Sequence, residues 1–416
     1  MQNKNIIDRI LLGTIVLLAA LPFAQVFHLR LGGITLTAFE VLYFVIIVLV
    51  LFRVLMDGRI KRTALPFLLF SATIGLYYFI STFLYGRQTI NVVNQLREYL
   101  PFFVGTILLA VGTTEKAEKY LRALVVAALW SSSTALIIHH FMPGVLAKML
   151  PRSSEVVILT TVHGRLHWTN SGLVLFVVLA AILPRRQIHV NKWLIGMGLL
   201  LTTAGLINTI NRTMVVALIL FLGGYVLGEK QLVSVLRRSK KAIAVGAIAV
   251  VIILGLMSVF PKVNVLVKNR YFGSGAGVSH LLETGLMKER VPIYAQYGRS
   301  IKKHFPVGQG LGMPFHVRPD GKGVFTSDIS FISFFLPFGL IGLILFIVFV
   351  HSLFGLIAKA REHFQERTIR VMRLFLIVSV IASLNLDLFS RNNFVIFASM
   401  LVLTLQNGRT IQNNEI

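Results

Sequence analysis

Stretches of roughly 20 apolar residues recur along this chain of 416 residues, and they limit its possible folds more than any other feature. One helix needs about 20 such residues to cross a hydrocarbon core about 30 Å thick. The composition agrees, because 56% of the residues are hydrophobic and only 14% are charged, whereas soluble domains carry about 25% charged residues. Segments such as 193–210 do not alternate as the strands of a membrane β-barrel do. The sequence therefore predicts an all-α, polytopic integral membrane protein.

We predict twelve transmembrane helices: nine within residues 1–259 and three within 326–408, before a cytoplasmic tail at 409–416. The spans lie near residues 10–27, 34–55, 64–84, 98–113, 120–142, 170–184, 193–210, 212–228, 242–259, 327–357, 369–387 and 393–408. A cytoplasmic N-terminus puts most Lys and Arg of the short connecting segments on the cytoplasmic side, as the positive-inside rule requires. Both termini are then cytoplasmic, and the long segment 260–325 lies on the outer face.

Several classes of function lack their expected marks. The net charge of +25 would suggest a nucleic-acid partner in a soluble chain. In a membrane protein, Lys and Arg also act as topology signals and bind lipid headgroups or phosphates. The chain has no cysteine, which excludes disulfides and thiol chemistry. Walker A, dinucleotide-binding and Gly-x-Ser-x-Gly motifs are also absent from the sequence.

The long outer segment contains a candidate membrane-surface helix at residues 289–305. Apolar residues occupy one face of this helix and basic residues lie elsewhere on it, a pattern that favours a position among lipid headgroups. The apolar residues are Ile293, Tyr294, Tyr297, Ile301 and Phe305, and the basic ones are Arg290, Arg299, Lys302 and Lys303. Pro292 fits because we place it in the first turn, and Pro306 ends the helix.

Three glycines follow at alternate positions, namely Gly308, Gly310 and Gly312. Glycine permits backbone conformations in which N–H groups converge on an anion, so these residues are candidates for binding a substrate phosphate. A flexible return of the chain into the next span would give the same spacing. The spacing leaves both interpretations open.

Charged residues at span ends are the main candidates for chemistry, because a charge at mid-bilayer costs about 2.5–3.5 kcal/mol. Arg212 and Arg290 are expected at the outer face. A guanidinium there can bind phosphate in a fork geometry, or simply extend to the interface. Asp328 opens the tenth span, where it can act as a general base or cap the following helix.

Other polar residues are weaker candidates. Glu40 is a potentially buried charge near the outer end of a span, and Asp387 with Arg391 has the i,i+4 spacing of a structural ion pair. His163 and His167 also have this spacing, but no acidic residue lies close enough in sequence to complete a zinc site. We expect neither a metal nor another cofactor.

The order of these features resembles the O-antigen polymerase and O-antigen ligase superfamily of bacterial membrane glycosyltransferases. The resemblance covers roughly the second half of the chain. It rests on Asn211-Arg-Thr at the start of an apolar span, on Arg290 heading a helix that runs into His304-Phe-Pro-Val-Gly-Gln-Gly-Leu-Gly, and on the return Asp328-Ile-Ser-Phe-Ile-Ser-Phe. Ligases usually begin that return with His-Asn-Ser, so Asp328 favours the polymerase side.

The resemblance implies an inverting, metal-independent glycosyltransferase of polysaccharide biosynthesis in the bacterial inner membrane. Its implied donor is an undecaprenyl-pyrophosphate-linked oligosaccharide. The acceptor is a glycan or, for a ligase of lipopolysaccharide assembly, lipid A-core; membrane lipids and a chain-length regulator are further partners, and nucleic acid is not. In this interpretation Asp328 deprotonates the acceptor hydroxyl, while Arg212 and Arg290 hold the pyrophosphate.

Two other classes of function stay open. A lipid-linked glycan flippase or another secondary transporter would also need basic residues facing anionic headgroups. It would place charges deep inside the bundle, along a path open to both sides. A scaffold or lipid-binding protein is a third interpretation, and it predicts that no single arginine affects any turnover.

Overall fold

The computed structural model describes residues 2–23, 28–31, 34–58, 62–142, 168–184, 190–209, 212–228, 287–317, 323–324, 329–383, 388–389 and 392–407. In these residues the chain forms thirteen α-helices and two short β-hairpins, which confirms the all-α class. The helices are α1 (Gln2–Ala20), α2 (Ala38–Asp57), α3 (Leu65–Phe79), α4 (Thr89–Arg97), α5 (Leu100–Leu108), α6 (Ala117–Phe141), α9 (Leu173–Ile182), α10 (Lys192–Thr209), α11 (Arg212–Gly228), α15 (Met287–His304), α16 (Ser330–Lys359), α17 (Glu366–Ala382) and α18 (Phe394–Thr404).

Among the described helices, four are long and apolar enough to cross a membrane: Ala38–Asp57, Leu65–Leu84, Ala117–Phe141 and Ser330–Glu362. Large apolar side chains lie on their outer surfaces; Trp130 of α6 is 62% exposed and Phe52 of α2 is 55% exposed. Extended apolar surface of this kind marks contact with lipid or with a partner. These features indicate a membrane protein. The count of twelve spans stays a prediction, and the span near 242–259 lies outside the described residues.

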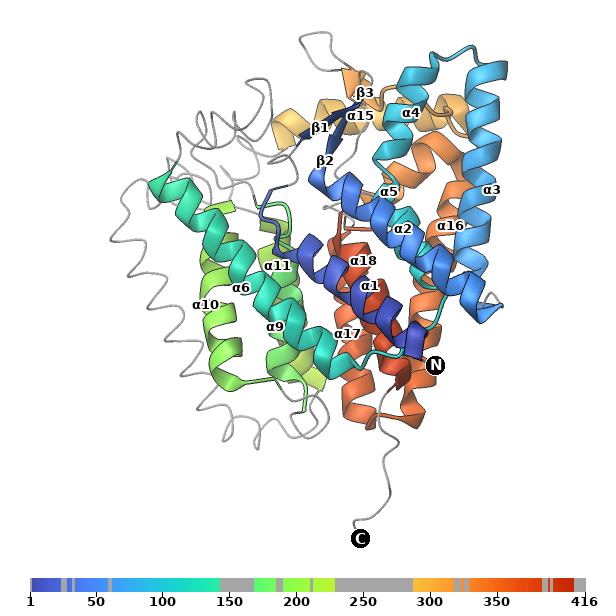
Figure 1. Cartoon of the computed structure of the whole chain (residues 1–416). Helices are drawn as coiled ribbons and strands as arrows, with labels where there is room; N and C mark the ends of the chain where they lie inside the picture. Colours follow the sequence, from blue (N-terminus) through green and yellow to red (C-terminus); the bar gives the residue numbers. More distant parts are fainter. Residues whose placement is uncertain are drawn as a thin grey trace.

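The helices form one bundle in which α1, α17 and α18 lie between two groups (Figure 1). Helices α2, α3, α5 and α16 form one group, and α6, α9, α10 and α11 form the other. The core is apolar and rich in aromatic rings, for example Phe176 against Phe375 with ring centroids 5.1 Å apart. A buried polar link crosses it, because Asn393 Nδ2 donates to Asn170 Oδ1 (2.9 Å) and Asn393 Oδ1 accepts from the Tyr43 hydroxyl (2.5 Å).

Different segments lie at the two ends of the bundle, which we call the terminus end and the loop end. At the terminus end, α1 begins close to the start of α6, since Asp8 accepts hydrogen bonds from the backbone N–H and the hydroxyl of Thr114. The chain after α18 returns to this end, where the Asn407 side chain donates to the Thr113 carbonyl. At the loop end lie α4, α15 and the hairpins β1–β2 (His28–Leu31, Ile34–Thr37) and β3–β4 (His316–Val317, Gly323–Val324).

Helix α16 differs from the prediction of one span over residues 327–357. Gly339 has φ 58° and ψ −142°, which breaks the helix into residues 330–338 and 340–359. The two parts fold sharply against each other. This is shown by Phe334 and Phe346, which lie on either side of the kink and whose stacked rings have centroids 5.7 Å apart. In a straight helix twelve residues span about 18 Å. The part after the kink is about 30 Å long, so it alone has the length to cross a bilayer.

Three further predicted boundaries differ from the structure. Helix α1 begins at Gln2 rather than near residue 10 and ends at Ala20, two residues before Pro22. The predicted span at 98–113 contains only the nine-residue helix α5, because residues 98–99 form a turn after α4 and residues 109–116 are not helical. Helix α15 begins at Met287, two residues earlier than predicted, so Pro292 lies beyond the first turn.

Candidate functional site

The glycine-rich segment after α15 packs into the loop end as a fixed turn. Gly308, Gly310 and Gly312 have φ values of 90°, 80° and 77°, in the left-handed region that favours glycine. A Cβ atom added to Gly308 would lie 2.4 Å from the backbone nitrogen of Gly339, at the kink of α16. The alternate glycines are therefore explained by backbone conformation and by the close approach of two backbone segments.

Five successive amides of this segment donate to protein oxygens. The N–H groups of residues 308, 309 and 310 donate to the carbonyls of His304, Leu336 and Pro337. Those of residues 311 and 312 donate to Ser81 Oγ (2.7 Å) and Gln95 Oε1 (2.6 Å). In this conformation no amide of Gly308, Gly310 or Gly312 is free for an anion. The interpretation of these glycines as an anion-binding loop therefore has no support from the geometry.

Two tyrosines of the neighbouring helices secure the same region. The Tyr77 hydroxyl of α3 lies between the carbonyls of Val307 and Phe338 (2.9 Å for Phe338), which share its single proton in a bifurcated hydrogen bond. The Tyr99 hydroxyl, just before α5, donates to the carbonyl of Ser333. Both tyrosine side chains are buried. The kink of α16 and the glycine segment are thus held together as one rigid unit.

Helix α15 packs against the first part of α16. Tyr297 joins Phe315, Ile329, Ile332 and Leu336 in a small buried cluster separate from the main core. The predicted apolar face of α15 therefore divides, since Ile293 and Ile301 also pack against this cluster while Phe305 is 61% exposed. Most of that face contacts the protein rather than lipid.

Two predicted site residues, Arg290 and Asp328, are close in sequence to residues of this cluster. Arg290 belongs to the first turn of α15, seven residues before Tyr297, so the two positions share one helical face. Asp328 lies outside the described residues, but it directly precedes Ile329, which packs in the cluster with Tyr297. The backbones of α15 and of the start of α16 are therefore close together at the loop end.

Arg212 is the first residue of α11, which packs against α17. The two helices are antiparallel, because Tyr225, later in α11 than Phe221, accepts a hydrogen bond from Arg367, earlier in α17 than Phe375. Phe221 of α11 packs against Phe375 of α17, with ring centroids 6.0 Å apart.

Position 212 lies nine residues before Phe221. In an antiparallel pair this places it level with a position about nine residues after Phe375, which is at the end of α17. There the Ser383 carbonyl accepts a hydrogen bond from Ser330 N–H at the start of α16 (3.0 Å). The side chains of Arg212 and Arg290 are outside what the structure describes.

The weaker candidates have structural roles or lie outside the described residues. Glu40 forms a capping box with Thr37 at the start of α2 and accepts from Arg97 Nε at 2.6 Å. This contact raises the pKa of Arg97. His163, His167, Asp387 and Arg391 are outside the described residues. Within the described part of the chain, no three His, Asp or Glu side chains form a metal-binding group.

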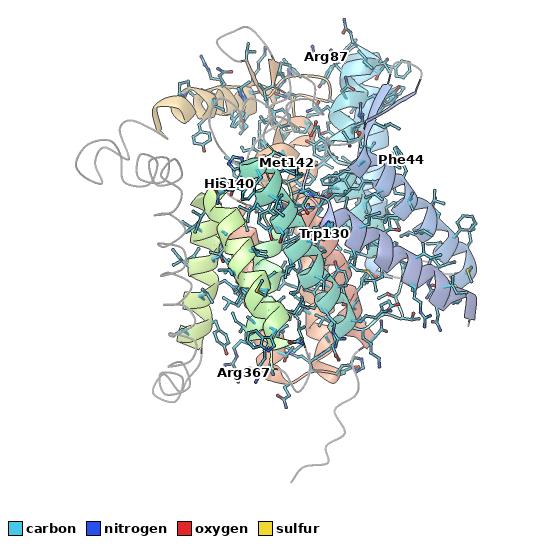
Figure 2. The ribbon with its side chains drawn as sticks, turned by 60° about the vertical axis from the view of Figure 1, so that its left-hand side comes forward. Phe44, Arg87, Trp130, His140, Met142 and Arg367 are labelled. Atoms are coloured by element: carbon cyan, nitrogen blue, oxygen red, sulfur yellow. The ribbon has the colours of Figure 1, made fainter. Side chains whose placement is uncertain are left out.

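Sequence reasoning missed two polar residues beside the glycine segment, Arg87 and Gln95. Figure 2 shows Arg87 at the loop end, opposite Arg367. Its guanidinium is partly buried and donates from Nη2 to Met313 Sδ at 3.3 Å. Burial lowers the pKa of His304, and the charges of Lys303 and Arg87 lower it further. The only sequence signal was the Gly86-Arg87 turn, which carries no information about its tertiary partners.

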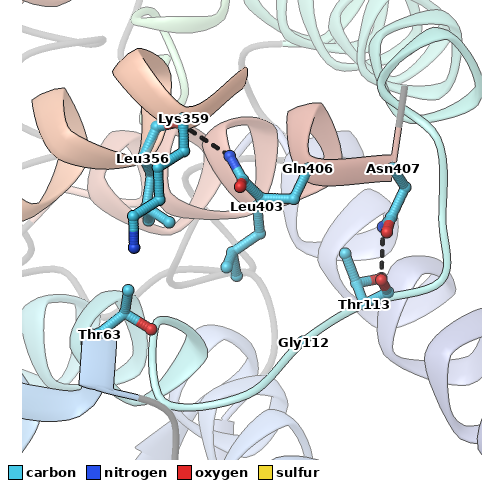
Figure 3. Close-up of a pocket in the computed structure, with 8 residues that line it drawn as sticks. All are labelled: Thr63, Gly112, Thr113, Leu356, Lys359, Leu403, Gln406 and Asn407. Carbon is cyan, nitrogen blue, oxygen red and sulfur yellow. Dashed lines mark hydrogen bonds between the residues drawn. The ribbon is translucent and has the colours of Figure 1, made fainter. Parts of the chain in front are cut away.

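A small pocket of about 280 Å³ lies at the terminus end, away from these residues (Figure 3). It is lined by Thr63, Gly112, Thr113, Leu356, Lys359, Leu403, Gln406 and Asn407. The Gln406 amide donates to the Leu356 carbonyl (2.8 Å), and the Asn407 amide donates to the Thr113 carbonyl. None of the predicted site residues lines this pocket.

No protein-family model matches the chain, and no curated protein matches it either. The inference of function therefore depends on the residues and on the way the loop end is built.

Proposed function

We propose that this protein is a membrane glycosyltransferase of the O-antigen polymerase type. It transfers a glycan from an undecaprenyl-pyrophosphate-linked donor to an acceptor sugar hydroxyl at the outer face of the bacterial cytoplasmic membrane. One observation carries the proposal, and it concerns the start of α11, helix α15 and the start of α16. These are the three segments whose sequences resemble the superfamily. Helix α15 packs against the start of α16, whose Ser330 N–H donates to the Ser383 carbonyl at the end of α17, the helix that packs beside α11.

The proposal includes a topology. The chain crosses the membrane twelve times, with both termini in the cytoplasm, so the terminus end faces the cytoplasm and the loop end faces the periplasm. Arg361 and Arg367 support this orientation, because both are on the terminus side of the bundle. Cytoplasmic segments are enriched in Lys and Arg.

In the proposed reaction, Asp328 accepts the proton of the acceptor hydroxyl. The acceptor oxygen forms a bond to the anomeric carbon of the donor sugar while the bond from that carbon to the phosphate oxygen breaks. The bonding electron pair leaves with undecaprenyl pyrophosphate, and attack from the opposite face inverts the anomeric configuration. Arg212 and Arg290 bind the pyrophosphate and stabilise the negative charge that develops on it.

The rigid unit around Gly308 and Gly339 supports this scheme indirectly. Catalytic groups must be held in place by well-packed surroundings if they are to act on one geometry. Here α15 and the start of α16 are fixed by the Tyr297 cluster and by the tyrosine hydrogen bonds. The glycines thus contribute by fixing the backbone near positions 290 and 328 rather than by binding the donor through their amides.

The test is a reconstitution of the purified protein with a short lipid-pyrophosphate oligosaccharide, followed by analysis of product length. We expect a ladder of lengthened lipid-linked chains, lost in Asp328→Asn and kept in Glu118→Gln, which changes an exposed acid at the opposite end. Arg212→Ala and Arg290→Ala should each lower the rate on the order of 100-fold.

Other outcomes would change the assignment. A ladder from Asp328→Asn, or near-normal turnover of both arginine variants in folded protein, would contradict the mechanism. A single transfer to lipid A-core without a ladder would identify a ligase. Movement of labelled donor across vesicles in the absence of acceptor would identify a transporter.

A further inference from the structure

The Arg87 side chain has hydrogen-bond donors without suitable acceptors. Its Nε atom is buried and has no hydrogen-bond partner among the described residues. Its only hydrogen bond there runs from Nη2 to the thioether of Met313, which is a weak acceptor. No described carboxylate pairs with it. A guanidinium has five N–H donors and no acceptor, so Arg87 has donors available for acceptor oxygens, and it pairs most strongly with anionic ones.

Gln95 adds a second unmatched donor next to the same turn. Its side chain is 1% exposed, and its Oε1 accepts from the Gly312 N–H, which fixes the orientation of the amide. Its Nε2 is buried with no hydrogen-bond partner in the described part of the protein. Most buried polar side-chain atoms in proteins have a partner, so two such donors in one place require an explanation.

Both side chains lie beside Gly312. A Cβ atom built on Gly312 would be 3.4 Å from Arg87 Cβ, and the nitrogen of Gly312 is 2.6 Å from Gln95 Oε1. Positive charge is also present in this region, because the charges of Lys303 and Arg87 lower the pKa of His304. The position therefore offers donors and positive charge, and among the described residues no carboxylate pairs with Arg87.

We propose that Arg87 and Gln95 form a binding position for a lipid-borne phosphate beside the glycine segment. A guanidinium matches the two-oxygen geometry of phosphate, and an amide N–H adds a third donor. The loop end is where lipid headgroups would meet the bundle. An isoprenoid pyrophosphate and a phospholipid headgroup share this chemistry. Assigning the position to the sugar donor rests on the proposed function, whereas the binding position itself does not.

The first test measures binding of geranylgeranyl pyrophosphate to the full-length protein in detergent, by ligand-induced increase of the melting temperature and by titration. Arg87→Gln should weaken binding about tenfold or more, because a charge-assisted hydrogen bond is lost, and it should abolish the ligand-induced increase. Arg299→Gln is the matched control. It removes the same charge from an exposed residue of α15 at the same end, and it should change the affinity less than twofold.

Gln95→Glu is a second test. Unlike a substitution that removes a contact, it should raise the melting temperature of the protein without ligand. A carboxylate keeps the acceptor for the Gly312 N–H and presents an anionic oxygen in place of the unmatched amide nitrogen. The variant should melt at a higher temperature than wild type without ligand and should lose the ligand-induced increase. A purely structural role for Gln95 would give a lower melting temperature with binding unchanged, which would overturn its place in the site.

The remaining outcomes are also decisive. Equal weakening by Arg87→Gln and Arg299→Gln would show nonspecific charge attraction and overturn the proposal. If phosphatidylglycerol binding, and not geranylgeranyl pyrophosphate binding, depends on Arg87, the position takes a phospholipid and the link to the donor is wrong. Loss of chain extension in Asp328→Asn with binding intact separates the two proposals. Turnover retained in Asp328→Asn would refute the mechanism alone.

Discussion

Two arginines at opposite ends of the bundle, Arg53 at the terminus end and Arg87 at the loop end, have different surroundings. At the terminus end, Arg53 Nε lies 3.0 Å from Asp8 and Arg53 Nη1 lies 2.7 Å from Asp57, which also accepts from Lys4. Asp8 is fully buried, and each acid has a basic partner. At the loop end, Arg87 has only a thioether as partner in the described residues.

This difference separates structural charges from charges that are available to a ligand. Burying an ion is costly unless it is paired and hydrogen-bonded, and the pairs at the terminus end meet that condition while joining α1 to α2. Although the loop end also holds the paired Arg97 and Glu40, Arg87 and Gln95 beside the glycine segment instead have donors without a partner among the described residues. Such an arrangement is suited to bind an anion rather than to stabilise the fold.

The largest effect should come from breaking the paired network. Arg53→Met keeps most of the side-chain volume but leaves the Asp8 carboxylate buried without its cation, so we expect a loss of about 3–5 kcal/mol in the free energy of unfolding. Activity per folded molecule should not change. Denaturant titration in detergent micelles, together with the chain-extension assay, measures both quantities.

The matched control is Arg122→Met, which breaks an exposed pair with Glu118 at 3.3 Å. Exposed ion pairs contribute under about 1 kcal/mol. If Arg53→Met is no more destabilising than Arg122→Met, the buried network does not stabilise the protein and the contrast between the two ends fails. A loss of activity without a loss of stability would point to a functional role for Arg53 instead.

The same network explains why the first helix was predicted to begin too late in the chain. Charged residues near its start excluded 2–9 from an apolar span, yet Lys4 and Asp8 are helical because they pair with α2. Apolar runs were sufficient to locate α2, α3 and α6. Periodicity could not locate the kink at Gly339, since apolar residues continue on both sides of it, although Pro337 and Gly339 in one run were a usable signal.

A smaller but substantial effect is expected at the rigid unit of the loop end. Gly308→Ala forces a positive φ on alanine and places a methyl group against the backbone of Gly339, which should cost about 2–4 kcal/mol in unfolding free energy. Chain extension should fall as well, because the backbone near position 328 shifts. Thermal unfolding and the extension assay test both effects.

Gly298→Ala on α15 is the control, because nothing lies within 4 Å of the added methyl group. Alanine is the better helix former, so this variant should be more stable by up to about 1 kcal/mol. A Gly308→Ala protein as stable and active as wild type would show that the segment is not a rigid support. The contrast between the two ends would then rest on charge alone.

The site itself was only partly accessible from the sequence. The order of the motifs indicated Arg212, Arg290 and the glycine segment as candidates. The positive φ values of Gly308, Gly310 and Gly312 explain why these positions are glycine. The hydrogen bonds of the Leu311 and Gly312 amides could not be predicted. Their acceptors, Ser81 and Gln95, are more than 200 residues away in the sequence. Arg87 was missed for the same physical reason: whether a cation is paired depends on tertiary contacts.

The smallest predicted effect concerns pH and tests the charge of Arg87 directly. The pKa of His304 lies below its usual 6.5 because of burial and the charges of Lys303 and Arg87. The unfolded chain therefore binds a proton more readily than the folded protein, and stability falls as the pH decreases from about 6.5 to the lowered pKa. Above that window His304 is neutral in both states and contributes no pH dependence.

We expect the melting temperature of the wild type to fall more between pH 7 and pH 5 than that of His304→Gln. Arg87→Gln should reduce the difference between these two proteins, because one of the charges that opposes protonation is gone. Bound pyrophosphate should reduce it in the same way by neutralising Arg87, whereas Arg299→Gln should leave it unchanged. If Arg87→Gln has no effect on the pH dependence, the guanidinium does not act on His304, and the basic cluster at the loop end is not a unit.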